Sequence, residues 1–109
     1  MKTLSKQQAR NRGGHKIGTL HGITYHDLLY TFGKPTFYPE DSGDGKVNFE
    51  WVIEYKDRYF SIYDYKTWDE EYTKTKLTEW SVGGQGYAFD FIDAVESKIA
   101  SNRVDTTQE

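Results

Sequence analysis

Residues 49–68, FEWVIEYKDRYFSIYDYKTW, constrain the fold more than any other part of this chain of 109 residues. From residue 47 to residue 55, large apolar side chains alternate with mainly polar ones, which is the two-residue period of a β-strand with one buried face. The letters YKDR supply turn residues, and residues 59–66 have the composition of a returning strand. This stretch predicts a β-hairpin whose apolar face is covered by other elements, because an isolated hairpin is only marginally stable.

Two segments outside the hairpin have the sequence signals of helices. Thr24 can cap a helix with Asp27 in its first turn, and Gly33 followed by Pro35 would end it. Residues 87–100 place apolar side chains at helical spacing along one face. We expect both helices to pack on the apolar face of the hairpin.

The remaining segments complete a single small domain. Residues 15–23 and 77–82 suit short strands, so the predicted fold is α+β, with a small antiparallel sheet of three to four strands and two helices packed on one face. Residues 1–14 lack apolar periodicity and end in two glycines, which predicts a flexible basic N-terminal arm. The α+β domain is expected over residues 15–101, followed by a polar C-terminal tail at residues 102–109.

The charges are distributed unevenly along the chain. Five of the 14 basic residues lie within residues 1–16, which contain no acidic residue, whereas all 17 acidic residues follow. A basic arm of this kind is either a solvated tail or a site that attracts the phosphates of a nucleic acid. In the second case the nucleic-acid-binding residues are Lys2, Lys6, Arg10, Arg12 and Lys16.

Aromatic and acidic side chains accumulate in the middle of the chain. Aromatic residues make up 17% of the sequence, and residues 40–71 contain ten acidic residues against four basic ones. An acidic surface repels nucleic-acid phosphates, whereas exposed rings surrounded by acids suit contact with a basic protein. The predicted protein-binding residues are Glu50, Glu54, Tyr63, Asp64, Tyr65, Trp68, Asp69, Glu70 and Glu71.

The letters GGQG, residues 83–86, lie between an expected strand and an expected helix. Backbone N–H groups at such a place can bind a phosphate, although the Lys-Ser/Thr pair of a P-loop is missing. A tight strand-to-helix turn is the alternative interpretation. If the site exists, its anion-binding residues are Gly83, Gly84 and Gly86, and together with the basic arm they would form a nucleic-acid or nucleotide-binding module.

The sequence lacks the signatures of catalytic and metal sites. There is no cysteine, which excludes disulfides and thiolate catalysis, and the spacing of the three histidines matches no zinc site. Glu50 and Glu54 form a carboxylate pair on one strand face, but nothing in the sequence indicates a cleft around them. We therefore expect no enzymatic activity, no metal and no cofactor.

No apolar run approaches the roughly 20 residues that span a bilayer, so no membrane partner is expected.

Three motifs together resemble those of a family of viral proteins. They are GI-TYHDLLYTFGKPT, EWVIEY-D---SIYDYK and EWSVGG, and they extend from about Gly22 to Gly84. They are similar to small accessory proteins of unknown function from tailed phages and large DNA viruses, which have a helix ending in Phe-Gly-x-Pro and strands with Glu-Trp, Ile-Tyr-Asp-(Tyr/Trp)-Lys and Trp-x-(Ile/Val)-Gly-Gly. Tyr65 and Val82 stand where Trp and Ile are more usual. The family has no established activity, so the resemblance assigns no functional residue.

The resemblance implies an accessory viral protein made inside a bacterial cell, and such proteins commonly bind and inhibit host machinery. We therefore expect a phage-type, non-enzymatic binding protein that inhibits a host factor through its acidic aromatic surface. The expected target is a nucleic-acid-handling or defence enzyme in the cytoplasm of the infected bacterium. The protein would be a monomer or a homodimer, and the nucleic-acid or nucleotide-binding module remains the alternative.

Overall fold

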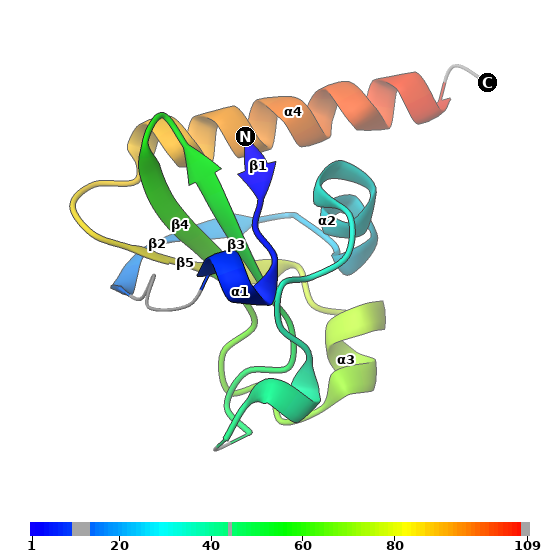
Figure 1. Cartoon of the computed structure of the whole chain (residues 1–109). Coiled ribbons are helices and arrows are strands. Elements are labelled where there is room, and N and C mark those ends of the chain that lie inside the picture. The colour runs from blue at the N-terminus through cyan, green and yellow to red at the C-terminus, as the bar shows by residue number, and fades with distance from the viewer. Residues whose placement is uncertain (10–13, 44, 108–109) are drawn as a thin grey trace.

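A computed structural model describes residues 1–9, 14–43 and 45–107, which form an α+β fold around an antiparallel sheet (Figure 1). The sheet has five strands in the order β1-β3-β4-β5-β2. In chain order the elements are β1 (Lys2–Thr3), α1 (Lys6–Ala9), β2 (His15–His21), α2 (Tyr25–Phe32), the 3-10 helix η1 (Pro39–Asp41), β3 (Glu50–Tyr55), β4 (Arg58–Tyr63), α3 (Glu70–Thr75), β5 (Glu79–Gly84) and α4 (Phe89–Thr107).

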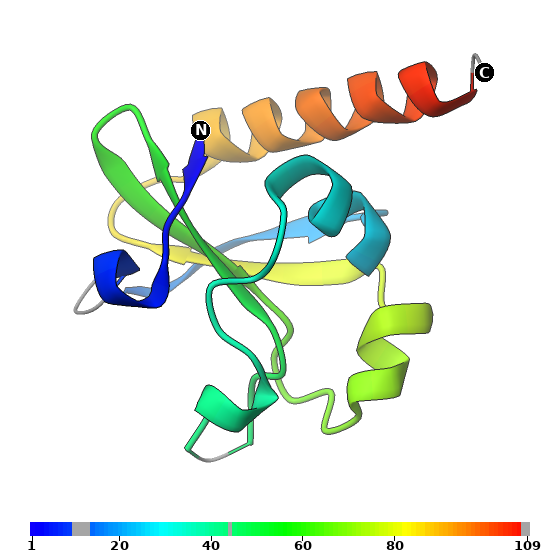
Figure 2. The same cartoon turned by 45° about the vertical axis from the view of Figure 1, so that its right-hand side comes forward.

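The predicted hairpin is confirmed as β3 and β4. Tyr55 pairs with Arg58, and the two residues between them, Lys56 and Asp57, both have positive φ values of 50° and 63°. Positive φ at both central residues matches the turn whose twist suits a two-residue hairpin. The turn lies near the start of α4, at the end of the molecule opposite α3 (Figure 2).

The helix predicted after Thr24 is confirmed as α2. The Thr24 hydroxyl accepts a hydrogen bond from Asp27 N at 3.1 Å, and the Asp27 carboxylate accepts one from Thr24 N at 2.8 Å. These reciprocal bonds satisfy N–H groups that a helix start leaves free. Both ends of α2 are also tied to the core, because the indole of Trp80 donates to Ile23 O and that of Trp51 donates to Gly33 O, at 2.8 and 2.9 Å.

The main core lies between the sheet and the two longer helices, α2 and α4, as the sequence predicts. The rings of Phe60 and Phe91 stack with a centroid distance of 4.2 Å, and Trp51 meets Trp80 edge to face at 5.7 Å. Few but large rings therefore provide much of the buried area. The fully or almost fully buried members are Leu20, Leu28, Phe49, Trp51, Ile53, Phe60, Ile62, Trp80, Val82, Phe91, Val95 and Ile99.

The sequence underestimates the number of elements. Within the described residues the sheet has five strands rather than three to four, and there are four α-helices rather than two. The charged connection after Trp68 contains α3, which Asp69 caps by accepting hydrogen bonds from Glu71 N and Tyr72 N. The prediction of a separate polar tail at residues 102–109 is wrong for its described part, because α4 continues through these residues to Thr107.

The C-terminal part of α4 is held by contacts with α2. Asn102 Nδ2 donates to Thr31 Oγ1 at 2.9 Å, and Arg103 Nε donates to Asp27 Oδ1 at 3.1 Å. Partial burial raises the pKa of Asp27, but hydrogen bonds from Arg103 and Thr24 outweigh it and hold the pKa below its ordinary value. Polar side chains therefore extend the helix beyond the point where its apolar pattern ends.

The prediction that residues 1–14 form a flexible arm is wrong for residues 2–9. β1 pairs with β3, and Leu4 and Ala9 are buried against Val52 in a second, smaller apolar cluster. Arg10 and Arg12 lie outside the described residues. The N-terminal segment, here residues 2–9, is thus part of the fold.

Candidate protein-binding face

The sheet has a second face, turned away from α2 and α4, and its side chains are mostly polar. Successive side chains of a strand point to opposite faces, so the residues between the core positions of β3 and β4 share this face. The register aligns Glu50, Tyr63, Ser81 and Thr19 across four strands. We call the following group the second sheet face: Thr19, Glu50, Val52, Glu54, Tyr59, Ser61, Tyr63, Glu79 and Ser81.

The register shows which side chains of the returning strand lie on the same face as Glu50 and Glu54. Tyr59 and Tyr63 stand opposite them in the register, at Glu54↔Tyr59 and Glu50↔Tyr63. The candidate face therefore combines acids with tyrosines. A hollow of about 250 Å³ lies at one side of it, lined by Lys16, Thr19, Tyr65, Thr67, Leu77, Glu79, Trp80 and Ser81.

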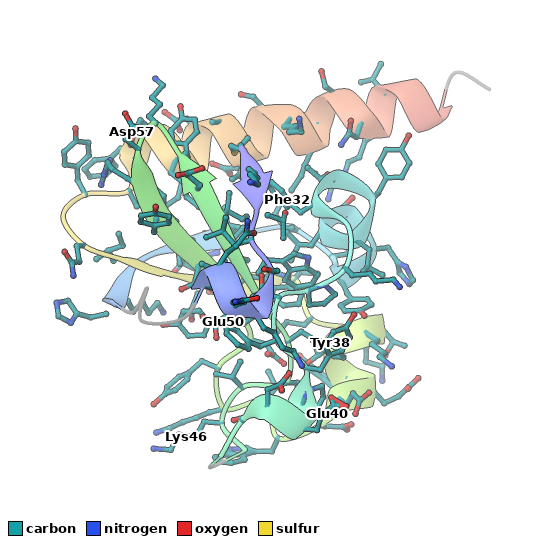
Figure 3. All side chains as sticks on the ribbon, viewed as in Figure 1. Phe32, Tyr38, Glu40, Lys46, Glu50 and Asp57 are labelled. Atoms are coloured by element: carbon teal, nitrogen blue, oxygen red, sulfur yellow. The ribbon has the colours of Figure 1, made fainter. Side chains whose placement is uncertain are left out.

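Glu50 occupies a largely desolvated position on the second sheet face. Burial raises the pKa of Glu50, and a hydrogen bond from Ser61 only partly opposes this, while the nearby Asp64 adds to the rise. Burial also raises the pKa of Tyr63, and Glu50 and Tyr65 contribute further. Figure 3 shows Glu50 at the opposite end of the hairpin from Asp57.

We expect Glu50→Gln to increase stability more at pH 8 than at pH 4. The pKa of Glu50 in the folded protein lies above its ordinary value of 4.5, so the folded state binds more protons than the unfolded state between these two pKa values. The free energy of unfolding contributed by Glu50 then falls as the pH rises through this interval. Urea unfolding of both proteins at the two pH values measures the effect, with the exposed Glu71→Gln as the control. An equal effect of Glu50→Gln at both pH values would contradict this expectation.

Asp64 is buried and cannot meet a partner directly, which corrects its assignment as a binding residue. Its side chain is 1% exposed and accepts five hydrogen bonds. The donors are the backbone N–H groups of Asn48 and Phe49, at 2.8 and 2.9 Å, and side-chain groups of Asn48, Thr67 and Thr73, at 2.9, 3.2 and 2.6 Å. Asp64 therefore joins the end of β4, the start of β3 and α3.

Residues 65–72, which we call the acidic aromatic segment, follow Asp64 directly and are largely exposed. The exposed fractions of Tyr65, Trp68 and Tyr72 are 48%, 62% and 44%. Lys66 and Trp68 have positive φ values of 56° and 59°, a conformation that costs free energy in residues with a side chain. The Asp64 network and a hydrogen bond from Lys66 N to Lys46 O, at 2.7 Å, hold this backbone in place. The rings of Tyr65 and Trp68 are therefore presented by an anchored loop, and that of Tyr72 by the first turn of α3.

The acids of this segment are also exposed. Asp69 caps α3, and Glu70 pairs with Lys74 at 3.1 Å. Glu71 is exposed beside them. The segment thus places three carboxylates within four residues of Trp68.

The predicted protein-binding residues are only partly brought together. Tyr65, Trp68, Asp69, Glu70 and Glu71 lie in the acidic aromatic segment, at the end of the molecule marked by α3 in Figure 1. The neighbouring sheet face contributes Glu50 and Tyr63, while Glu54 lies farther along β3 and pairs in register with Lys2 of β1. The predicted set does not include Tyr72 and Glu79, although Tyr72 is exposed in the acidic aromatic segment and Glu79 is exposed on the second sheet face. Asp69 followed by two glutamates is the sequence signal for the start of α3.

The glycines expected to bind an anion have packing roles. Gly83 and Gly84 lie inside β5 rather than at the start of a helix, since α4 begins only at Phe89. A Cβ atom on Gly83 would lie 2.6 Å from Ser61 Oγ, and one on Gly84 would lie 3.2 Å from the ring of Phe60. These close approaches explain the two glycines without a ligand.

The turn after β5 receives a cation from within the protein. Arg58 donates to the backbone carbonyls of Gln85 and Tyr87, and its guanidinium lies 4.5 Å from the centroid of the Tyr87 ring. Gly86 has a φ of 82°, which glycine adopts without strain. Carbonyl oxygens rather than free N–H groups therefore point toward Arg58 here.

The basic residues assigned to the arm lie on separate, structured elements where they are described. Lys2 belongs to β1, Lys16 is exposed on β2, and Lys6 pairs with Asp41 at 2.9 Å. Arg10 and Arg12 fall outside the described residues.

Among the residues that the structure describes, no group of three or more histidine, aspartate or glutamate side chains could hold a metal ion. No helix in residues 1–9, 14–43 or 45–107 is both long and apolar enough to cross a membrane. We compared the chain with protein-family models, curated proteins and solved structures, and none of them matches it.

Proposed function

We propose that this protein is a non-enzymatic binding protein that contacts a basic protein surface. The contact is made by the acidic aromatic segment, residues 65–72, and the adjoining part of the second sheet face. One observation supports this most strongly. Three exposed rings and three exposed carboxylates stand on the loop after β4 and the first turn of α3, and the buried Asp64 holds both parts through Thr67 and Thr73 while Lys66 and Trp68 keep an otherwise unfavourable backbone conformation.

The physical reason is that anchored aromatic residues bind at low entropic cost. Tryptophan and tyrosine are frequent hot spots of protein interfaces, because they bury large areas and have few rotatable bonds. A loop that is already ordered loses less conformational entropy on binding than a mobile one. The carboxylates of Asp69, Glu70 and Glu71 would attract a basic partner and raise the association rate.

The resemblance to accessory viral proteins supports a more specific form of the proposal. The partner would be a host protein in the cytoplasm of an infected bacterium, and its basic surface would be the nucleic-acid site of a processing or defence enzyme. Occupation of that surface would inhibit the enzyme. We favour this over a nucleic-acid-binding module, because Lys6 is paired with Asp41 and Gly83 and Gly84 are packed within the sheet.

The double variant Glu70→Lys/Glu71→Lys tests the role of charge and leaves the cap at Asp69 intact. We expect its association rate with the partner to fall by about tenfold or more at low salt, and the salt dependence to weaken. The matched control is Asp93→Lys/Glu96→Lys, which changes the charge equally at exposed positions of α4. Surface plasmon resonance at several salt concentrations measures both. Equal rates for the two variants would refute the proposal.

A further inference from the structure

We propose that the outer edge of β3, together with Thr36, Tyr38 and Asp41, is a binding site for an extended basic peptide segment of the partner. In this structure the chain's own N-terminal segment, residues 2–9, fills the site. The inference rests on the proposed function, which already requires a basic partner, and adds a second place and a mode of contact. It predicts that the partner displaces the N-terminal segment.

The backbone of the N-terminal segment shows how the site takes an extended chain. β1 pairs with β3 in antiparallel register, at Lys2↔Glu54 and Thr3↔Ile53. Leu4 N then donates to Val52 O at 2.8 Å, and Leu4 O accepts from Thr36 Oγ1 at 2.7 Å. An added strand at a sheet edge is a common way to bind a peptide, because main-chain hydrogen bonds give affinity for any sequence.

Two side chains supply the sequence preference. Leu4 is 6% exposed and packs in the small cluster with Val52, Phe37 and Tyr59. Two positions later, Lys6 Nζ lies 2.9 Å from Asp41 Oδ2 and 6.0 Å from the centroid of the Tyr38 ring. A carboxylate next to an aromatic ring is a favourable environment for an ammonium or guanidinium group. The site therefore selects an aliphatic residue at the end of the extended part, followed two residues later by a basic one at the start of a helical turn such as α1.

Two hollows beside the N-terminal segment leave space for further side chains of a bound peptide. A shallow groove of about 500 Å³ runs beside this segment, lined by residues that include Lys6, Phe32, Thr36 and Tyr38. A second hollow of about 270 Å³ shares Tyr38 with this groove. It is lined by Phe37, Tyr38, Asp41, Ser42, Val47 and Glu50. Asp41 and Tyr38 already receive Lys6, and the carboxyl group of Glu50 and the ring of Phe37 on the same hollow suit a further basic side chain.

The N-terminal segment competes with the partner's peptide for this site, and its own contacts with the site are few. Its strand pairing covers only two residues, and its apolar contacts form a cluster separate from the main core. When a binding-competent state is only partly populated, the apparent affinity for a ligand falls by that fraction. Weakening the internal contacts should therefore strengthen peptide binding in trans.

The test uses the full chain and a fluorescein-labelled peptide with the sequence of residues 1–9, MKTLSKQQA. Leu4→Asp and Lys6→Glu weaken the internal contacts but leave the β3 edge, Tyr38 and Asp41 unchanged. We expect either variant to bind the peptide about tenfold or more tightly than the wild-type chain, as measured by fluorescence anisotropy. A peptide with both substitutions, MKTDSEQQA, should bind the variants at least tenfold more weakly.

Circular dichroism establishes that each variant is folded, and Lys6→Glu changes an exposed side chain whose loss leaves the apolar cluster intact. Lack of saturable binding by both folded variants would overturn the inference, as would equal binding of the two peptides. Dimerisation through exchanged N-terminal segments, without peptide binding, would also overturn it. The assay needs no host protein. The double variant Glu70→Lys/Glu71→Lys should bind the peptide with an affinity within about twofold of that of the wild-type chain. Failure here is thus separable from failure of the proposed function.

Discussion

Asp64→Ala is expected to lower the free energy of unfolding by on the order of 3–5 kcal/mol. The substitution removes the acceptor of five hydrogen bonds and leaves the N–H groups of Asn48 and Phe49 and the hydroxyl of Thr73 without it. A buried donor that loses its partner costs about 1–3 kcal/mol, so two or three of them account for the expected loss. Urea unfolding measures it, provided that the slope of free energy against urea is unchanged.

Two further variants make this result specific. Asp93→Ala, at an exposed position of α4, should change stability by less than about 0.5 kcal/mol. Asp64→Asn keeps one oxygen that can accept from Asn48 N and Phe49 N, but its amide nitrogen cannot accept from Thr67 or Thr73. We therefore expect an intermediate loss. A loss below about 1 kcal/mol for Asp64→Ala would mean that the network does not anchor the loop.

Trp68→Ala is expected to weaken partner binding by about 30-fold or more, which is the effect of losing a hot-spot ring. Stability should change little, because 62% of Trp68 is exposed and alanine meets the same positive-φ strain as tryptophan. Titration calorimetry with the purified partner gives the affinity, and urea unfolding gives the stability.

The control for Trp68→Ala is Phe89→Ala. Phe89 has the highest exposed fraction among the exposed large apolar side chains of the described chain, 79%, but it lies at the start of α4, away from the acidic aromatic segment. We expect its replacement to change affinity by no more than about twofold. Similar effects of the two variants would mean that general surface apolarity, rather than the anchored segment, drives binding.

The hairpin and α2 could be predicted from sequence because their signals are local. Alternating side chains in residues 47–55 and the pair Thr24 and Asp27 specify a strand and a helix start within a few residues. The pairing of β1 with β3 could not be predicted in this way. It depends on two strand residues and the burial of Leu4, which are contacts between segments 48 to 52 residues apart in the sequence.

The candidate site shows the same division between local and tertiary information. The sequence identifies the acidic and aromatic character of residues 65–71, and the structure leaves most of these side chains exposed. The prediction from sequence assigns Asp64 to the protein-binding surface. The alternation that buries Phe60 and Ile62, however, also places Asp64 on the core side, directly after β4. The buried carboxylate of Asp64 is stabilised by hydrogen-bond donors from Asn48, Phe49 and Thr73, which only the folded chain brings together.

The most direct test of the central claim is affinity capture from bacterial lysate with wild-type protein and Tyr65→Ala/Trp68→Ala as parallel baits. Each lysate is tested with and without nuclease, and the bound material is identified by mass spectrometry and nucleic-acid staining. The account predicts a stoichiometric basic protein that survives nuclease treatment and is absent from the double-variant bait. Equal recovery of that protein on both baits, or recovery of nucleic acid alone, would contradict it.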